Sequence, residues 1–106
     1  MDQSIQSYLK PELDEASKVL LRAADYIEKW GWCQYDLRDA RGRVCLMGAI
    51  YSVAGEQGLM KDAIEKTLFA FNSFADGPLP STWDDAPGRT KEEVCAKLRS
   101  VALGGA

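Results

Sequence analysis

Apolar residues recur at helical spacing near the start of the chain, and this pattern constrains the fold more than any other feature. The residues are Leu13, Ala16, Leu20, Ala23, Ala24, Ile27 and Trp30. Intervals of three and four residues place them on one face of a helix, and that face must be buried against other elements. Pro11 suits the first turn of this helix and Gly31 suits its end. We therefore expect a helical protein.

Three further helices are expected. The segment 45–54 is apolar nearly all round, which is typical of a buried central helix. Gly48 within it costs about 1 kcal/mol relative to alanine, which indicates close approach of another backbone. A helix over 59–75 presents an apolar stripe of Met60, Ile64, Leu68, Phe71 and Phe74. The last helix follows a capping box of Thr90 and Glu93, with Val94, Leu98, Val101 and Ala102 facing inward and Gly104 ending it.

The connection between the first two helices changes period. Cys33, Tyr35 and Leu37 alternate with polar residues, as in a β-strand. The stretch 39–42 is typical of a turn in which Gly42 adopts a positive φ. We therefore predict a mainly α fold, a compact bundle of about four helices with a small β-hairpin between helices 1 and 2. A second connection over 77–89 is rich in proline and glycine, and within it residues 81–84 are expected to form one short turn.

Length and charge narrow the class of protein. The 106 residues predict one domain over 1–106, with 1–9 as a loosely ordered lead-in. No apolar run is long enough to cross a membrane, and the first residues do not resemble a signal peptide, so we expect a cytoplasmic protein. The net charge of −3 makes nucleic acid an unlikely partner.

The chain contains no histidine. Catalysis that depends on histidine is therefore excluded within one chain, including Ser-His-Asp and Cys-His machinery. Zinc sites that need imidazole are excluded for the same reason. Any catalysis would have to use carboxylates, thiols, lysine, tyrosine or a bound metal.

Two cysteines bracket the predicted hairpin and are candidate catalytic residues. Cys33 and Cys45 could form a redox pair or supply a thiolate, which requires a cationic neighbour or a helix N-terminus. The alternative, which we favour, is that both are small buried thiols, since free cysteine is among the most buried residues. Cys95 would add a third sulfur for zinc, but the chain has no Cys-x-x-Cys pair, so no metal site and no cofactor are predicted.

Two adjacent carboxylates lie in the second connection. Asp84 and Asp85 could bind a divalent cation or act as an acid–base pair. The alternative, which we again favour, is architectural: an aspartate supports the turn through its own backbone while Trp83 fills the edge of the core.

The residues carried by the two connections favour a surface for a protein partner. Tryptophan, tyrosine and arginine dominate interface hot spots. The expected surface joins the Trp30–Arg43 hairpin to the Trp83–Arg89 loop, and its residues are Trp32, Tyr35, Arg38, Arg41, Arg43, Trp83 and Arg89. We therefore expect a non-enzymatic protein-interaction or accessory domain. The alternatives are a small thiol- or carboxylate/metal-dependent enzyme and a single-stranded nucleic-acid accessory factor. The apolar stripe from Met60 to Phe74 is widened by Phe69. Part of this stripe could pack against a second copy of the chain, so a homodimer is conceivable.

Three motifs resemble an uncharacterised family of small bacterial and phage proteins. They are Gly31-Trp32-Cys33-Gln34, the stretch Arg43-Val44-Cys45-Leu46-Met47-Gly48-Ala49, and Trp83-Asp84-Asp85-Ala86-Pro87-Gly88-Arg89-Thr90. The similarity runs from about Leu20 to Ala102 and implies no activity. The resemblance implies asparagine at the position of Asp84, so this chain departs from the family pattern there. A carboxylate cannot replace the amide if the amide donates a hydrogen bond.

Overall fold

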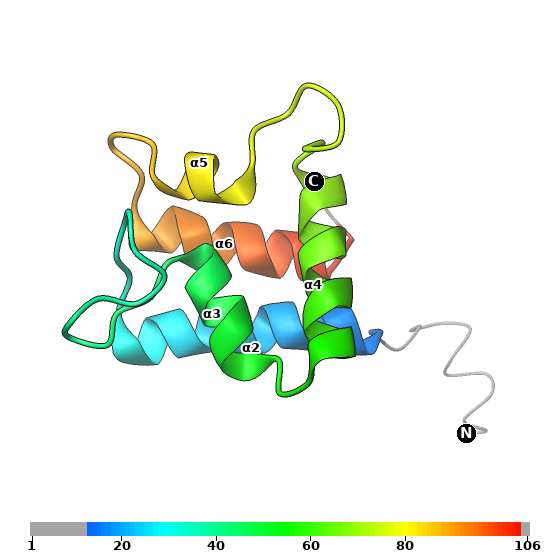
Figure 1. Ribbon diagram of the computed structural model, residues 1–106, viewed down its shortest axis with the longest axis horizontal. Coiled ribbons are helices and arrows are strands. Elements are labelled where there is room, and N and C mark those ends of the chain that lie inside the picture. Colours follow the sequence, from blue (N-terminus) through cyan, green and yellow to red (C-terminus); the bar gives the residue numbers. More distant parts are fainter. Residues whose placement is uncertain (1–12, 105–106) are drawn as a thin grey trace, which may run out of the picture.

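The computed structural model describes residues 13–104, which form five helices (Figure 1). They are α2 (Glu15–Trp30), α3 (Leu46–Val53), α4 (Gln57–Ala70), α5 (Pro80–Asp84) and α6 (Lys91–Ala102). Helices α2 and α6 lie side by side and antiparallel, while α4 crosses them near one end and α3 packs against α2 (Figure 1). The prediction of a compact, mainly helical fold is confirmed. None of the helices in this part of the chain is long and apolar enough to cross a membrane.

Local signals place both ends of α2. The carboxylate of Asp14 accepts a hydrogen bond from the Ser17 N–H at 2.7 Å, so Asp14 is the N-cap. Gly31 ends the helix with φ 100°. The buried face comprises Ser17, Val19, Leu20, Ala23, Ala24 and Ile27. The predicted apolar face is therefore confirmed in its centre, whereas Trp30 is exposed. Pro11 and the lead-in 1–9 lie outside the described residues.

The predicted fourth helix is confirmed as α6. Its N-terminus has the expected capping box, in which Thr90 accepts from the Glu93 N–H and Glu93 accepts from the Thr90 N–H. The inward residues are Val94, Cys95, Leu98, Val101 and Ala102. They pack against α2, so the antiparallel pair of helices forms the centre of the core.

Helix α3 is only partly buried, and the prediction of a helix buried all round is wrong. Leu46, Ala49 and Ile50 face the core, but Tyr51 and Ser52 are exposed. The reason is that the contacts of this eight-residue helix with α2, α4 and α5 leave Tyr51 and Ser52 uncovered. The prediction for Gly48 is confirmed, because the Leu37 carbonyl occupies the space that a β-carbon would need.

The face that helix α4 turns to the core overlaps the expected stripe, since Phe71 is buried and Met60 and Ile64 pack against the core. Its buried residues are Ala63 and Thr67, followed by Phe71 beyond the helix end. The small side chains at 63 and 67 permit the close crossing with α2. The predicted stripe is half-buried at Met60, Ile64 and Leu68 and exposed at Phe74. The helix ends at Ala70, short of residue 75, because Asn72 adopts φ 56°.

The predicted β-hairpin between helices 1 and 2 is not present. Val44 forms isolated bridges with Trp32 and Arg38, and no ladder extends from them within the described chain. The extended path breaks at Tyr35, which adopts φ 71° and gives its N–H to the Asp85 carboxylate. The predicted turn is confirmed, since the Gly42 N–H donates to the Asp39 carbonyl at 3.0 Å and Gly42 has φ 83°.

Candidate functional site

The structure brings the two connections together. We call residues 31–45 the α2–α3 loop. The Trp32 indole donates to Asp84 Oδ1 at 2.9 Å, and the Gln34 amide donates to the carbonyls of Asp84 and Ala86, both at 3.0 Å. The α2–α3 loop is therefore tied by side-chain hydrogen bonds to the end of α5.

Asp84 lies at the centre of this contact. Its side chain is 0% exposed. Oδ1 accepts from the Trp32 indole and also, at 3.1 Å, from the Leu46 N–H in the first turn of α3. The N-terminus of a helix favours a negative charge, because its N–H groups are unpaired there. Oδ2 is equally buried and has no hydrogen-bond partner among residues 13–104.

Burial controls the protonation of Asp84. Removal from water raises the pKa of its carboxyl from 3.8 to about 6. The hydrogen bonds from Trp32 and Leu46 oppose this rise, whereas the neighbouring Asp85 carboxyl raises the pKa further. In its neutral form Asp84 can donate a hydrogen bond to the neighbouring Asp85 side chain. Asp85 Oδ1 also accepts the Tyr35 N–H at 2.8 Å.

This geometry explains how an aspartate can stand where the family resemblance implies asparagine. An asparagine carbonyl could accept the same two hydrogen bonds as Oδ1. Its amide would then lie where Oδ2 lacks a partner, facing the Asp85 carboxyl. Neutral Asp84 reproduces that donor, but the ionised carboxylate does not. The expectation that a carboxylate cannot replace the amide therefore applies to the ionised form.

Trp83 and Arg89 support α5 against the core. The Arg89 guanidinium lies over the Trp83 ring, 3.9 Å from its centroid, and its Nε donates to the Trp83 carbonyl at 2.9 Å. Nη1 pairs with Glu93 at 3.0 Å. The Trp83 ring also packs edge-on against Phe71. Both predicted surface residues thus have internal partners and are half-buried.

The three arginines of the α2–α3 loop are placed differently. Arg38 donates to the Tyr26 hydroxyl at 2.8 Å and to Ser52 Oγ at 2.7 Å, so it links α2 to α3. Arg43 pairs with Asp39. Arg41 is exposed, and its backbone N–H donates to Asp39 Oδ1.

The thiol groups are buried and protonated. Burial raises the pKa of Cys33 to about 11, that of Cys95 to about 12, and that of Cys45 above its usual 9.0. The Cys45 sulfur caps α3 by accepting from the Gly48 N–H at 3.4 Å. Asp84 lies close enough to raise the Cys45 pKa further, although nearby hydrogen bonds oppose it. These surroundings disfavour a thiolate.

Metal ligands are sparse at the contact between the two connections. Over residues 13–104, no group of three or more cysteine, aspartate or glutamate side chains is arranged to hold a metal ion. Asp84 and Asp85 are therefore not joined by a third acidic or thiol side chain placed to complete a metal site within the described residues.

Three participating residues lay outside the predicted site. Gln34 bridges two backbone carbonyls of the second connection, and Tyr26 and Ser52 receive the Arg38 guanidinium. Gln34 belongs to the Gly-Trp-Cys-Gln motif, so the sequence did contain a signal for it. Tyr26 and Ser52 stand on helices and had no comparable signal.

Comparisons with known proteins place the chain in a family. No curated protein and no solved structure matches it. The model of a family described as "Family of unknown function (DUF6197)" matches residues 11–103, which is most of the chain. The expected resemblance to an uncharacterised family is confirmed at that level, while its motifs and its bacterial and phage origin stay predictions. The chain belongs to the family of unknown function DUF6197.

Proposed function

We propose that this chain is a non-catalytic protein-binding domain whose recognition surface is carried by residues 30–41. The observation that carries the proposal is the exposure of three large side chains on this segment. Trp30 is 52%, Tyr35 73% and Leu37 54% exposed. Exposed aromatic and aliphatic groups carried by one short segment are typical of a site that another protein covers.

The backbone that carries these side chains is held in place by hydrogen bonds. The Asp39 carboxylate accepts from the N–H groups of Arg41 and Arg43, at 3.0 and 2.9 Å. Asp85 holds the Tyr35 N–H. A loop that is ordered before binding loses less conformational entropy when a partner docks, which favours recognition. In this proposal the Trp83–Arg89 loop, which was expected to form part of the surface, supports the surface instead.

Charge indicates the chemistry of the partner. Arg41 and Asp36 are both exposed on this segment, and Lys29 lies over the Trp30 ring at 5.2 Å. The Arg38 guanidinium already donates to Tyr26 and Ser52, and Asp39 is paired with Arg43. A partner that presents apolar side chains with a carboxylate opposite Arg41 fits this surface, because arginine binds carboxylates in a bidentate geometry.

The test compares proteins captured by three forms of the full chain. A loop variant combines Tyr35→Ser, Leu37→Ser and Arg41→Glu. A matched control combines Phe69→Ser and Phe74→Ser, which removes an exposed aromatic pair from the opposite end of the molecule. We expect one protein to be captured by the wild type and the control and lost by the loop variant. That protein, once purified, should protect the amides of residues 34–42 from hydrogen exchange.

Circular dichroism and thermal melting first establish that both variants fold as the wild type does. Identical protein sets from the wild type and the loop variant would contradict the assignment of the surface. A salt-dependent complex with a single-stranded oligonucleotide, abolished in the loop variant, would instead support the nucleic-acid alternative.

A further inference from the structure

Two adjacent carboxyl groups hold the α2–α3 loop against the end of α5. Asp84 accepts the Trp32 indole N–H at 2.9 Å, and Asp85 accepts the Tyr35 N–H at 2.8 Å. The Tyr35 hydroxyl also donates to the Asp85 carbonyl at 3.3 Å. We call these three hydrogen bonds the loop–α5 contact. They hold the segment that carries Tyr35, one of the exposed side chains of the proposed surface.

The backbone of Tyr35 has a conformation that a bulky residue disfavours. Its φ of 71° lies in the left-handed region, where a side chain crowds the backbone. Such a conformation persists only while the surrounding contacts maintain it. Since the Tyr35 N–H donates to the Asp85 side chain, the path of the loop at this point depends on the position of Asp85.

The surroundings of Asp84 favour its neutral form. Oδ2 is buried and has no hydrogen-bond partner within residues 13–104. The groups that face Asp84 are the Asp85 carboxyl, the Leu46 N–H and Cys45 thiol at the start of α3, and the uncharged Trp32 and Gln34 of the loop. The arginines of the loop and the one after α5 lie elsewhere: Arg38 donates to Tyr26 and Ser52, Arg43 pairs with Asp39, Arg89 pairs with Glu93, and Arg41 is exposed.

We propose that the loop–α5 contact is sensitive to pH: it is closed while Asp84 is neutral and it opens when Asp84 loses its proton. Neutral Asp84 can donate to the Asp85 side chain and so keep it in position to accept from Tyr35. Ionised Asp84 instead repels the Asp85 carboxylate, and two buried charges are screened less than charges in water. Separation of the loop from α5 relieves this repulsion, because water then reaches both carboxylates.

The direction of the pH dependence follows from the burial of Asp84. Burial raises the pKa of this carboxyl from 3.8 to about 6, and opening returns it towards 3.8. Opening therefore becomes easier as the pH rises from 3.8 to about 6. Between pH 5 and pH 8 the equilibrium constant for opening should increase roughly tenfold. A partner that requires the closed loop would bind less tightly as the pH rises, a consequence that rests on the proposed function.

Hydrogen exchange with solvent, measured by NMR on the full chain without any partner, tests the inference. The Tyr35 N–H and the Trp32 indole N–H should lose roughly tenfold in protection between pH 5 and pH 8, after correction for intrinsic exchange rates. Asp84→Asn should abolish this pH dependence, because an amide does not ionise. Asp85→Asn should move its midpoint to lower pH, because the new amide can accept from Tyr35 and donate to ionised Asp84.

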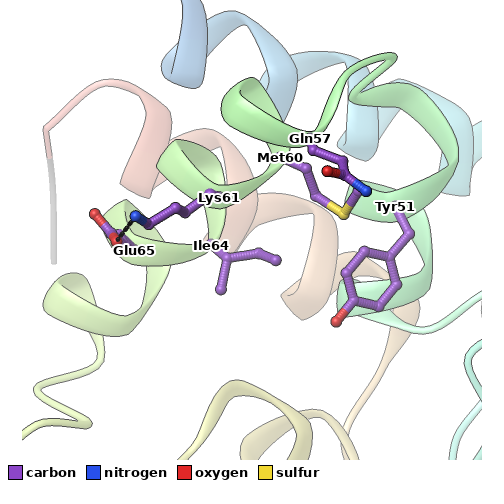
Figure 2. Close-up of a pocket in the computed structure, with 6 residues that line it drawn as sticks. All are labelled: Tyr51, Gln57, Met60, Lys61, Ile64 and Glu65. Carbon is purple, nitrogen blue, oxygen red and sulfur yellow. Dashed lines mark ion pairs between the residues drawn. The ribbon is translucent and has the colours of Figure 1, made fainter.

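Glu65→Gln is the matched control for removal of a carboxylate. Glu65 lines an open groove between α3 and α4, where Figure 2 shows it beside Lys61, 3.9 Å away. This variant should retain the full tenfold change. Equal protection at pH 5 and pH 8 in the wild type would overturn the proposal, and so would a pH dependence that persists in Asp84→Asn or keeps its midpoint in Asp85→Asn. None of these measurements involves a partner, so failure here is distinguishable from failure of the proposed protein-binding surface.

Discussion

The Asp84 carboxyl is buried where the two connections meet, with two donors on one oxygen and, among residues 13–104, no hydrogen-bond partner for the other. Burying a charge is unfavourable, so the folded protein holds the proton more tightly than the unfolded chain does. The pKa of this group is about 6 in the fold against an ordinary 3.8. That difference corresponds to roughly 3 kcal/mol of folding free energy.

The sign of the effect follows from the raised pKa. Below pH 3.8 the carboxyl is neutral in both states, so ionisation imposes no penalty on the fold. Between pH 3.8 and about 6 the unfolded chain loses its proton while the folded protein keeps it, and the stability contributed by Asp84 declines. Above about pH 6 the carboxyl is ionised in both states, so the stability lost through Asp84 no longer changes with pH.

Asp84→Asn should remove this dependence. The amide cannot ionise, its carbonyl can accept from Trp32 and Leu46, and its NH₂ can donate to Asp85. We expect the variant to exceed the wild type in free energy of unfolding by about 2–3 kcal/mol at pH 7, and the excess to fall to about 0.5 kcal/mol at pH 4 and to vanish near pH 3. Urea unfolding at half-unit pH intervals measures the difference.

Asp62→Asn is the control for loss of a carboxylate, since Asp62 is exposed on α4. It should change stability by no more than about 0.5 kcal/mol at any pH. A difference between Asp84→Asn and the wild type that stays constant from pH 4 to pH 7 would show that the proton is not linked to folding through Asp84.

At the scale of the elements, the helices with local signals at their ends were predictable. The Gly31 stop and the Thr90–Glu93 capping box act within a few residues of the chain, so the sequence around them is sufficient. The faces of α3 and α4 were less predictable. Both helices carry apolar residues on more than one side, and periodicity alone does not tell which side the core takes.

The α2–α3 loop shows where a local pattern fails. Alternation of polar and apolar residues predicted a strand, but the Tyr35 N–H finds its partner on Asp85, fifty residues further along the chain. The sequence identified Trp32, Asp84 and Asp85 as candidates for a site. It contained no local signal that the Trp32 indole donates to Asp84, because such a contact depends on how α5 packs against α3.

Gly48 connects this loop to α3 by backbone contact. A β-carbon at position 48 would collide with the Leu37 carbonyl, which is backbone and cannot rotate away. Gly48→Ala should therefore destabilise the protein by about 2 kcal/mol or more, despite the higher helix propensity of alanine. Thermal and urea unfolding measure the loss, and hydrogen exchange should locate increased opening in residues 36–46.

Gly58→Ala is the matched substitution within a helix. A β-carbon there would meet only Glu56 Oε1 at 3.7 Å, which is an ordinary contact. The variant should gain about 0.5–1 kcal/mol from helix propensity. Equal effects of the two substitutions would contradict the close packing of Leu37 on Gly48.

At the scale of the whole molecule, the three cysteines lie in different parts of the fold. Cys33 lies in the α2–α3 loop, Cys45 caps α3, and Cys95 lies in α6 against α2, where its sulfur faces the Ala24 carbonyl. All three are buried with a raised pKa. Only the thiolate reacts quickly with a disulfide reagent, so labelling requires the protein to open.

Labelling at pH 8 with mass-spectrometric detection should therefore proceed in a defined order. Cys33 should react first, through opening of the α2–α3 loop, and Cys95 last, at a rate that rises with urea as steeply as global unfolding does. The native protein should label at least about a hundredfold more slowly than the unfolded chain. Prompt labelling of Cys45 in the native protein would contradict the assignment of Cys45 as a buried, protonated thiol, because it would require a thiolate at the N-terminus of α3. That result would favour the thiol-dependent enzyme over the binding domain.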